Sequence, residues 1–353
     1  MSLETSDVRH GEELPIDRLA DFLQASSGLK GPVEIKQFPA GSSNLTYSVK
    51  FGADEFVLRR PPFGNKVKTA HDMRREFEVL SKLSAVYQPA PKPILFCGDD
   101  SVIGSEFFLM ERRRGLIIRG QAPKALESPQ LQRAVCESFV ENLAALHELD
   151  YNAADLTDLG HPAGYCRRQV EGWTNRYSAA KTHEWPELEN AIIWLNENIP
   201  PESGASLIHN DYKFDNIMLD PDDLTKITAV LDWEMVTIGD PLMDLGTTLG
   251  YWMSRDAGDE MLRMPFNPRV LMENIPRDKL VEMYAAAAGR DVSNVLFYYI
   301  FGTFKIAVIA QQIYARFARG STQDGRFAAF GRFAGKLGQI AVAELAKEKL
   351  SSF

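Results

Sequence analysis

The residue pattern of this chain changes near residue 115, and no other feature of the sequence constrains the fold as strongly. Before this point, β-branched and aromatic residues predict strands at 33–38, 44–51, 55–60, 93–98 and 106–112. After it, apolar residues recur at helical spacing in 128–149, 163–181 and 185–198, and only 201–238 is rich in strand formers. We therefore predict an α+β fold with two lobes. These are a small antiparallel-sheet lobe, residues 1–112, and a larger, mainly helical lobe, residues 113–353.

A carboxylate lies on the apolar stripe of the helix expected at 70–83. Glu76 shares one face of this helix with Met73, Phe77, Leu80 and Leu83. A carboxylate that turns inward needs a cationic partner, because burial of an unpaired charge is costly. Glu76 therefore either has such a partner or lies at the edge of the stripe and reaches solvent. A further helix is expected at 15–28, and a turn at Asp99 and Asp100.

The net charge of this 353-residue chain limits its partners. A formal charge of -9 argues against general nucleic-acid binding, because phosphate backbones attract clustered Lys and Arg. A local basic site for a small phosphate ligand remains compatible with that charge. Residues 1–15 are polar and acidic and lack the apolar core of a signal peptide, so we expect a disordered lead there.

The most apolar stretch, residues 295–317, has the length of a membrane span, about 20 residues. Gly302 and Lys305 interrupt this stretch, and the polar residues Gln311 and Gln312 follow them. A charge at bilayer depth is expensive, which favours a buried core helix and no membrane association.

The chain has three cysteines, Cys97, Cys136 and Cys166, which lie far apart and form no C-x-x-C motif. This usage is typical of reduced thiols and predicts a cytoplasmic protein. No spacing of Cys and His resembles a zinc site, so no structural metal is expected.

Residues 208–219, IHNDYKFDNIML, place polar and charged groups between two apolar flanks. Asp211 follows His209 by two residues, Asn216 follows Asp211 by five, and Asp232 comes 16 residues later at the end of an apolar run. Phosphoryl transfer needs a base for the acceptor's hydroxyl proton, oxygen ligands for magnesium and cations on the phosphates. The sequence contains a candidate for each.

These motifs carry a family resemblance. The pattern HxDxxxxN, followed by DWE and GDPLMDLG, resembles the aminoglycoside phosphotransferase and choline kinase superfamily over roughly residues 30–330. The segment VLRRPPFG resembles one branch of it, the kinase-like domains found in or near acyl-CoA dehydrogenases. The resemblance implies a protein-kinase-like fold and an enzyme that transfers the γ-phosphate of ATP to a small-molecule hydroxyl with Mg²⁺.

The resemblance implies that Asp211 is the catalytic base. Lys213 would neutralise charge on the moving phosphoryl group, with an exposed loop lysine as the alternative. Asn216 and Asp232 would hold magnesium, which prefers oxygen ligands.

Other polar residues of these motifs are expected to support the catalytic loop. His209 would bond to backbone and pack under the loop, and His147 would support a neighbouring helix. Asp244, and Asp240 with it, would brace the loop by hydrogen bonds.

The resemblance also implies a nucleotide site in the first lobe. The expected contacts are Gly41, Ser42, Ser43 and Asn44 over the phosphates, Arg59 and Glu76 in the cleft, and the backbone of Met110, Glu111 and Arg112 on adenine. An ordinary polar turn is the alternative for 41–44. Arg112, Arg113 and Arg114 could also reach a phosphate on a substrate such as a coenzyme A ester, with a solvated charge run as the alternative. The family usually carries a strand lysine where this chain has Arg59 or Arg60; the match to VLR favours Arg59.

The acceptor is the least determined part of the prediction. Residues 255–330 carry eight acidic and ten basic side chains, which disfavours a polycationic aminoglycoside. A hydroxy acid or hydroxyacyl-CoA is the first hypothesis, and an amino-alcohol, sugar or aminoglycoside is the alternative. A pseudokinase that binds a nucleotide or a partner is the alternative from another class. The oligomeric state cannot be read from the sequence.

Overall fold

The computed structural model describes residues 5–27, 31–39, 44–63, 72–119, 122–320 and 325–347. Their internal contacts divide the chain into two compact units. The first is Met1–Arg114 together with Thr228–Glu234, and the second is Gly115–Ile227 together with Met235–Phe353. Asp232 therefore belongs to the unit that contains the N-terminal sheet, although it lies far along the chain.

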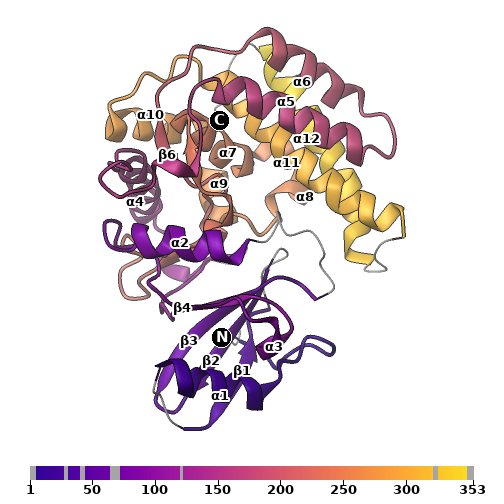
Figure 1. The fold of residues 1–353 in the computed structure, drawn as a ribbon. Coiled ribbons are helices and arrows are strands. Elements are labelled where there is room, and N and C mark those ends of the chain that lie inside the picture. Colours follow the sequence, from indigo (N-terminus) through magenta and orange to yellow (C-terminus); the bar gives the residue numbers. More distant parts are fainter. Residues whose placement is uncertain are drawn as a thin grey trace. The chain divides into compact units, whose positions relative to one another are not determined.

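The first unit is built on a five-stranded antiparallel sheet with the strand order β1-β2-β3-β5-β4 (Figure 1). The strands are β1 (Val33–Gln37), β2 (Leu45–Phe51), β3 (Asp54–Arg60), β4 (Pro93–Cys97) and β5 (Phe107–Glu111). The helices are α1 (Ile16–Ser27), α2 (Met73–Leu83) and α3 (Asp100–Ile103). The predicted sheet and both predicted helices of this part are confirmed.

Helices α1 and α2 cover opposite faces of this sheet, as two adjacent residues of β5 show. The ring centroid of Phe107 lies 5.7 Å from that of Phe22 on α1, and the centroid of Phe108 lies 6.2 Å from that of Phe77 on α2. Successive side chains of a strand point to opposite faces. The face toward α1 holds the apolar core of the unit, and the face toward α2 receives Glu76.

Two expectations for this unit are wrong. The turn at Asp99 and Asp100 is the short helix α3, because the Asp99 carboxylate accepts a hydrogen bond from the Ser101 amide at 2.9 Å and caps the helix. Residues 5–14 are not a disordered lead. Ser6 and Gln37 exchange backbone hydrogen bonds of 2.9 Å, and Leu14 is buried, because the open edge of β1 offers unpaired backbone groups.

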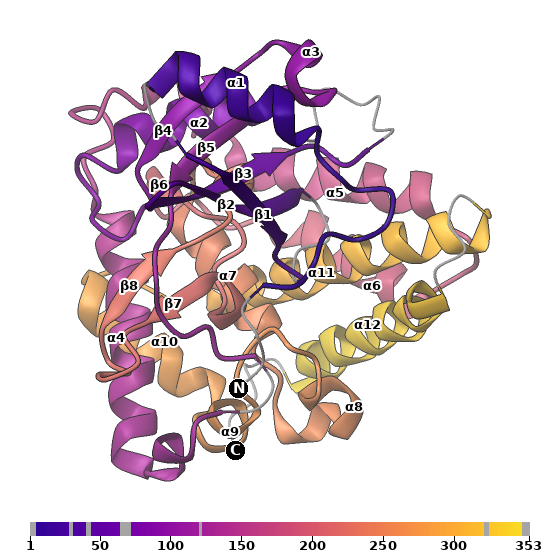
Figure 2. The same ribbon diagram turned by 90° about the horizontal axis from the view of Figure 1, so that it is seen from below.

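The second unit is mainly helical, as predicted (Figure 2). Its helices are α4 (Pro129–His147), α5 (Tyr165–Ala180), α6 (Pro186–Glu197), α7 (Pro241–Tyr251), α8 (Asp259–Leu262), α9 (Arg269–Asn274), α10 (Arg277–Ala288), α11 (Val295–Ala318) and α12 (Ala329–Lys347). Its short strands β6 (Ser206–Ile208) and β9 (Thr237–Gly239) pair antiparallel. The strand β7 (Ile217–Leu219) ends the motif at 208–219, and most of β8 (Ile227–Val230) belongs to the segment of the first unit that begins at Thr228.

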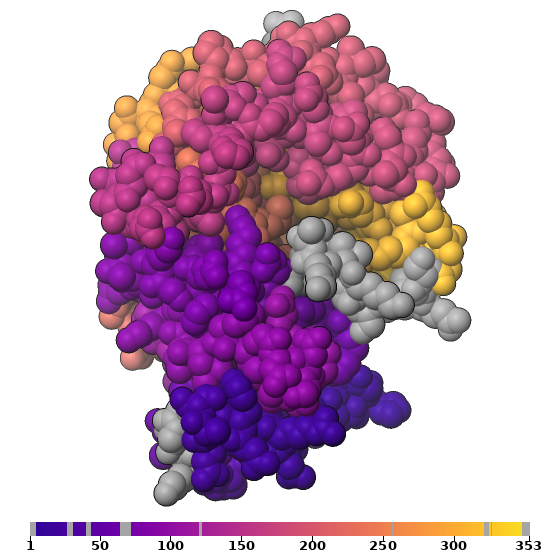
Figure 3. Space-filling view, viewed as in Figure 1, coloured from indigo at the N-terminus to yellow at the C-terminus, as the bar shows by residue number. Residues whose placement is uncertain are grey.

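Helix α11 is the core of this unit. It packs against α5, α6, α7 and α12, and Figure 3 shows α5, α6 (pink) and α12 (yellow) on the surface. The length and composition of α11 would allow it to cross a membrane, but 78% of its most apolar 18-residue window is buried inside the protein. The prediction of a buried core helix at 295–317 therefore agrees with the structure.

Helices α7 and α11 touch through two glycines. A Cβ atom added to Gly246 would lie 2.1 Å from the Tyr298 carbonyl oxygen, and one added to Gly302 would lie 2.0 Å from the Gly246 carbonyl oxygen. Neither distance is possible for a real side chain, so only glycine permits this approach. The close contact brings Lys305 of α11 within 3.5 Å of the Thr247 hydroxyl of α7.

Candidate functional site

One arginine organises the polar residues of the first unit. The Nη2 atom of Arg59 lies 2.9 Å from Asp232 Oδ1 and 3.8 Å from Glu234 Oε2, and its Nε atom lies 3.4 Å from Glu76 Oε2. One guanidinium is thus shared by three carboxylates.

The register of β3 explains why Arg59, and not Arg60, meets Glu76. Arg59 lies opposite Phe108 of β5, on the face covered by α2. Arg60 points to the other face, where its Nη1 atom donates to the Ile103 carbonyl at 3.1 Å and its guanidinium stacks on Phe63. The structure places Arg59 in the cluster, as the match to VLR favoured.

Glu76 does not reach solvent: its side chain is 2% exposed. Burial raises the pKa of Glu76 to about 7, against the opposing attraction of Arg59. The other alternative, an inward carboxylate with a cationic partner, agrees with these contacts.

The raised pKa of Glu76 predicts a pH-dependent stability. Between pH 4.5, its ordinary pKa, and about 7, the folded protein binds a proton at Glu76 that the unfolded chain does not. This contribution to the free energy of unfolding is present below pH 4.5 and is lost as the pH rises through 7. At 1.36 kcal/mol per unit, the change is about 3 kcal/mol.

Urea unfolding at pH 5 and pH 7.5 measures this contribution. We expect Glu76→Gln to show a smaller loss of stability between these pH values than the wild type. The control is Glu78→Gln, since Glu78 lies on the same helix but is 61% exposed. Equal pH dependence in wild type and Glu76→Gln would contradict the assignment.

Only part of the expected phosphate-covering segment can be placed. Gly41, Ser42 and Ser43 lie outside the described residues, so their expected role stays a prediction. Asn44 is buried, and its Nδ2 atom donates to Glu234 Oε2 at 2.7 Å. Asn44 thus extends the cluster around Arg59.

The expected adenine-binding segment lies at the end of β5. Met110 is buried, and Glu111 exchanges hydrogen bonds with Lys92, through the Glu111 amide at 2.9 Å and the Glu111 carboxylate at 2.8 Å. Arg112 is not part of a solvated charge run. Its Nη1 atom donates to Ser48 Oγ at 2.8 Å and pairs with Glu55, which leaves its side chain 7% exposed. The alternative of a solvated run is wrong for Arg112, because the sheet supplies a carboxylate beside it.

In the second unit, the segment after β6 brings three predicted site residues together. Asp211 Oδ2 pairs with Lys213 Nζ and accepts a hydrogen bond from Asn216 Nδ2 at 2.9 Å. The Asn216 amide also donates to the Asp211 carbonyl oxygen at 2.9 Å. Lys213 is buried, so the alternative of an exposed loop lysine is wrong. Among the residues that the structure describes, Asp211 Oδ1 has no hydrogen-bond partner.

Asp244 braces this loop from α7. Its carboxylate accepts hydrogen bonds from the backbone amides of His209 at 2.6 Å and Asn210 at 2.7 Å, and from His147 Nε2 at 3.2 Å. Burial alone would raise the pKa of Asp244, but His147 and His209 hold it below its ordinary value. The ring nitrogen Nδ1 of His209 accepts from the Asp211 amide at 3.2 Å. These contacts agree with the supporting roles expected for Asp244, His209 and His147.

Asp240 has a different task from the one expected. Its Oδ1 atom accepts from the Leu242 amide at 2.9 Å and caps α7, and its Oδ2 atom accepts from the Ser203 amide at 2.7 Å. Asp240 thus fixes the start of the helix that carries Asp244, and it supports the loop only through that helix.

Two residues of the predicted site motifs have left-handed backbone conformations. Asn210 and Asp232 both have φ of 67°, which Asn and Asp adopt more readily than other residues with a side chain. Strained or unusual backbone at such positions is typical of functional loops.

Sequence reasoning missed two polar residues of these clusters. Glu234 was present in DWE without a role, and it contacts both Arg59 and Asn44. Lys305 was noted only as an interruption of an apolar stretch, yet its ammonium lies 2.7 Å from the Asn210 carbonyl oxygen. A lone lysine in an apolar helix was the signal for it.

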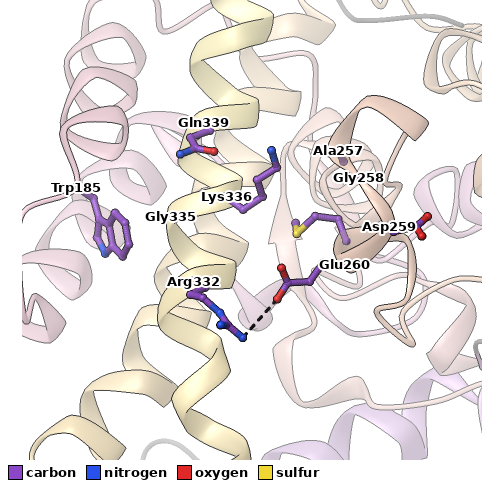
Figure 4. Close-up of a pocket in the computed structure, with 10 residues that line it drawn as sticks. Trp185, Ala257, Gly258, Asp259, Glu260, Arg332, Gly335, Lys336 and Gln339 are labelled. Atoms are coloured by element: carbon purple, nitrogen blue, oxygen red, sulfur yellow. Dashed lines mark ion pairs between the residues drawn. The ribbon is translucent and has the colours of Figure 1, made fainter.

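A separate hollow of about 460 Å³ lies in the second unit (Figure 4). It is lined by Trp185, 257–261, Arg332, Gly335, Lys336 and Gln339, and none of the predicted site residues is among them. Arg332 and Glu260 face each other across it at 3.8 Å. Both are exposed, so this ion pair contributes little stability.

The chain belongs to the phosphotransferase enzyme family, whose profile matches residues 34–291. Among curated relatives, human acyl-CoA dehydrogenase family member 11 is 38% identical over 297 residues, which cover 82% of this chain and 37% of that protein. Mouse acyl-CoA dehydrogenase family member 10 is 31% identical over 354 residues, which cover 99% of this chain and 33% of that protein. The chain thus spans about a third of the length of these relatives, and the predicted family branch is confirmed.

Solved structures lead to the same family. A Ralstonia eutropha protein assigned to the aminoglycoside phosphotransferases has a TM-score of 0.79 and 28% identity, covering 95% of this chain and 99% of that one. Choline kinase from Cryptosporidium parvum has a TM-score of 0.61 and 14% identity, covering 90% of each chain. The second likeness concerns the fold alone, which is the predicted protein-kinase-like fold.

Proposed function

We propose that this protein is an ATP-dependent phosphotransferase that moves the γ-phosphate to a hydroxyl group of a small hydroxy acid or hydroxyacyl-CoA. The observation that carries the proposal is the geometry of Asp211. Lys213 and Asn216 both contact its Oδ2 atom, and Oδ1 has no hydrogen-bond partner in the described ranges. A carboxylate held in this way can receive a proton through Oδ1.

The reaction that fits this loop is a single displacement. The acceptor's oxygen forms a bond to the γ-phosphorus, the bond between that phosphorus and the bridging oxygen breaks, and ADP leaves. The hydroxyl proton passes to Asp211 Oδ1. Lys213, beside Asp211, would neutralise charge on the phosphoryl oxygens as the phosphoryl group moves.

A magnesium ion in the proposed site would take part of its ligands from the protein and part from the nucleotide. The described residues contain no group of three or more His, Cys, Asp or Glu side chains that could hold a metal unaided. Asp232 and Asn216 would supply one oxygen each, and Mg²⁺ is commonly bound by one or two carboxylates plus substrate phosphates. When bound, the ion would neutralise phosphate charge.

Nucleotide binding in the first unit rests on Arg59. A guanidinium can make bidentate contacts with phosphate oxygens, and in this structure Arg59 donates to Asp232. Met110, Glu111 and Arg112 remain the proposed adenine contacts. The solved structure of a thermostable aminoglycoside phosphotransferase with AMP-PNP and hygromycin B, 15% identical with a TM-score of 0.60, has the same fold and supports the choice of ATP.

The surroundings of Lys213 favour an acceptor with an apolar part. Lys213 Nζ lies 4.9 Å from the ring centroid of Tyr251, and further centroid distances are 4.9 Å from Tyr251 to Phe266 and 6.0 Å from Phe266 to Phe333. Such a row of rings suits an acyl chain better than a polycation.

The cysteines bear on the cellular compartment of the protein. All three are free and buried, which supports a reducing compartment such as the cytoplasm. The assembled Asp211, Lys213 and Asn216 support an active enzyme over the pseudokinase alternative.

The test is a screen of ADP formation over hydroxy acids, their coenzyme A esters, amino-alcohols and aminoglycosides. We expect phosphorylated product with a hydroxy acid or its coenzyme A ester. Mass spectrometry of the product identifies the phosphorylated hydroxyl. Product from amino-alcohols or aminoglycosides alone would exclude the proposed acceptor class, and no product from any class would favour the pseudokinase.

A further inference from the structure

A buried lysine without an assigned role lies under the loop that carries Asp211. Lys305 is in the middle of α11 and is 2% exposed. Its Nζ atom donates to the Asn210 carbonyl oxygen at 2.7 Å, and lies 3.4 Å from Asn210 Oδ1 and 3.5 Å from the Thr247 hydroxyl. A buried ammonium is costly unless hydrogen bonds satisfy it, so these contacts account for its position.

The bond to Asn210 controls a peptide group next to the proposed base. The carbonyl of Asn210 and the amide N–H of Asp211 belong to one planar peptide group. Lys305 holds the oxygen of this group, and His209 Nδ1 accepts a hydrogen bond from its N–H at 3.2 Å. Hydrogen bonds therefore hold both the carbonyl oxygen and the N–H of the peptide group that precedes the Asp211 side chain.

Opposite charges on two helices hold the preceding residues. Asp244 of α7 accepts from the amides of His209 and Asn210, whereas Lys305 of α11 donates to the next carbonyl. The glycine contact between α7 and α11 leaves no room for a side chain between the two helices, so their backbones approach closely. The left-handed φ of 67° at Asn210 is thus stabilised by one anion on α7 and one cation on α11.

We propose that Lys305 is a positioning residue: its ammonium orients the Asn210–Asp211 peptide so that the Asp211 carboxylate faces the acceptor hydroxyl. This inference rests on the proposed phosphotransfer. Lys305 itself touches no substrate in this scheme. Its effect on the reaction passes through the backbone of Asp211.

The charge of Lys305 depends on its surroundings. Burial lowers the pKa of Lys305 to about 8, while Asp244 on α7 and Asp211 in the loop oppose this change, and Lys213 and Arg176 of α5 add to it. The ring of Trp173, also on α5, has its centroid 5.7 Å from Nζ. The ammonium is therefore lost in the folded protein as the pH rises above about 8. A charged donor makes a stronger hydrogen bond than a neutral one, so the loop should loosen in that range.

Steady-state kinetics of Lys305→Met and Lys305→Arg from pH 6.5 to 9.5 test the proposal. In Lys305→Met we expect kcat to fall about 10²-fold at neutral pH, since a small misplacement of a catalytic group can cost that much, with little change in the KM for ATP. The wild-type decline of kcat above about pH 8 should be absent from Lys305→Met. Lys305→Arg keeps a cation throughout this range, so it should restore part of kcat without that decline.

The matched control is Thr303→Val, a near-isosteric change at another fully buried side chain of α11. It should leave kcat and its pH profile unchanged. A kcat of Lys305→Met within twofold of the wild type would overturn the positioning role, and so would equal losses in Lys305→Met and Thr303→Val.

Hydrogen exchange separates this proposal from the proposed function. Amide exchange in residues 209–213 should be faster in Lys305→Met than in Thr303→Val, whether or not an acceptor has been found. Unchanged exchange would refute the positioning role. A further outcome is faster exchange in Lys305→Met while the wild type phosphorylates no acceptor. That result would support the role of Lys305 in holding the loop and would refute the proposed phosphotransfer.

Discussion

Replacement of Asp211 by Asn should lower turnover by about 10²–10⁴-fold, because a positioned general base contributes to the rate by that factor. Asparagine has nearly the shape of aspartate but cannot accept the proton at neutral pH. Nucleotide affinity should change little, since Asp211 is not among the proposed contacts to the nucleotide or to magnesium. Single-turnover kinetics with saturating ATP, together with calorimetry of ATP binding, measure the two effects separately.

Asp215 offers a matched control for this variant. It lies four residues after Asp211 and pairs with Arg119, and no role in the reaction is proposed for it. Asp215→Asn should retain most of the wild-type turnover. If Asp211→Asn phosphorylates the acceptor as fast as Asp215→Asn does, another group must accept the proton.

Loss of one partner of the buried Arg277–Glu344 pair should cause the largest change in stability, about 3–5 kcal/mol in the free energy of unfolding. Arg277 Nη2 lies 3.1 Å from Glu344 Oε1, and both side chains are 1% exposed. Arg277 also donates to the Trp252 carbonyl at 3.2 Å and to Ser254 Oγ at 3.0 Å. Glu344→Gln would leave a guanidinium buried with little compensating charge.

Urea unfolding followed by circular dichroism measures this effect. The double variant Arg277→Met/Glu344→Leu should lose much less than the sum of the single variants, because no uncompensated charge remains buried. The exposed pair Lys279–Glu282 on the same helix, α10, provides the control, and Glu282→Gln should change the free energy of unfolding by under about 1 kcal/mol. Additive losses in the double variant would show that the charges themselves stabilise the protein.

Much of the fold can be predicted from local sequence patterns. The same patterns predict which of two neighbouring arginines, Arg59 or Arg60, contacts Glu76. The alternation of side chains along β3 separates Arg59 from Arg60, because only one of them can share a face with Glu76. The proposed catalytic loop is also local: Asp211, Lys213 and Asn216 lie within six residues, so short-range geometry brings them together.

The rest depends on contacts between residues far apart in the chain. Lys305 meets Asn210 across 95 positions, and Arg277 meets Glu344 across 67. Periodicity places each of these residues on its own helix but gives no distance between helices. Helix α3 was missed for a different reason: one capping aspartate decides between a turn and a helical turn there.

The first unit consists of two separate segments of the chain, and this affects how segments of this protein could be recombined with those of its relatives. Residues 228–234 contribute Asp232 and Glu234 to the shell of Arg59, although they follow the first unit's main segment by more than a hundred positions. A chimera that swaps only the residues before 115 would combine Arg59 and Glu76 of one parent with carboxylates of another. Recombination would preserve the cluster only if both segments were inherited together, so these two stretches should be treated as one evolutionary module.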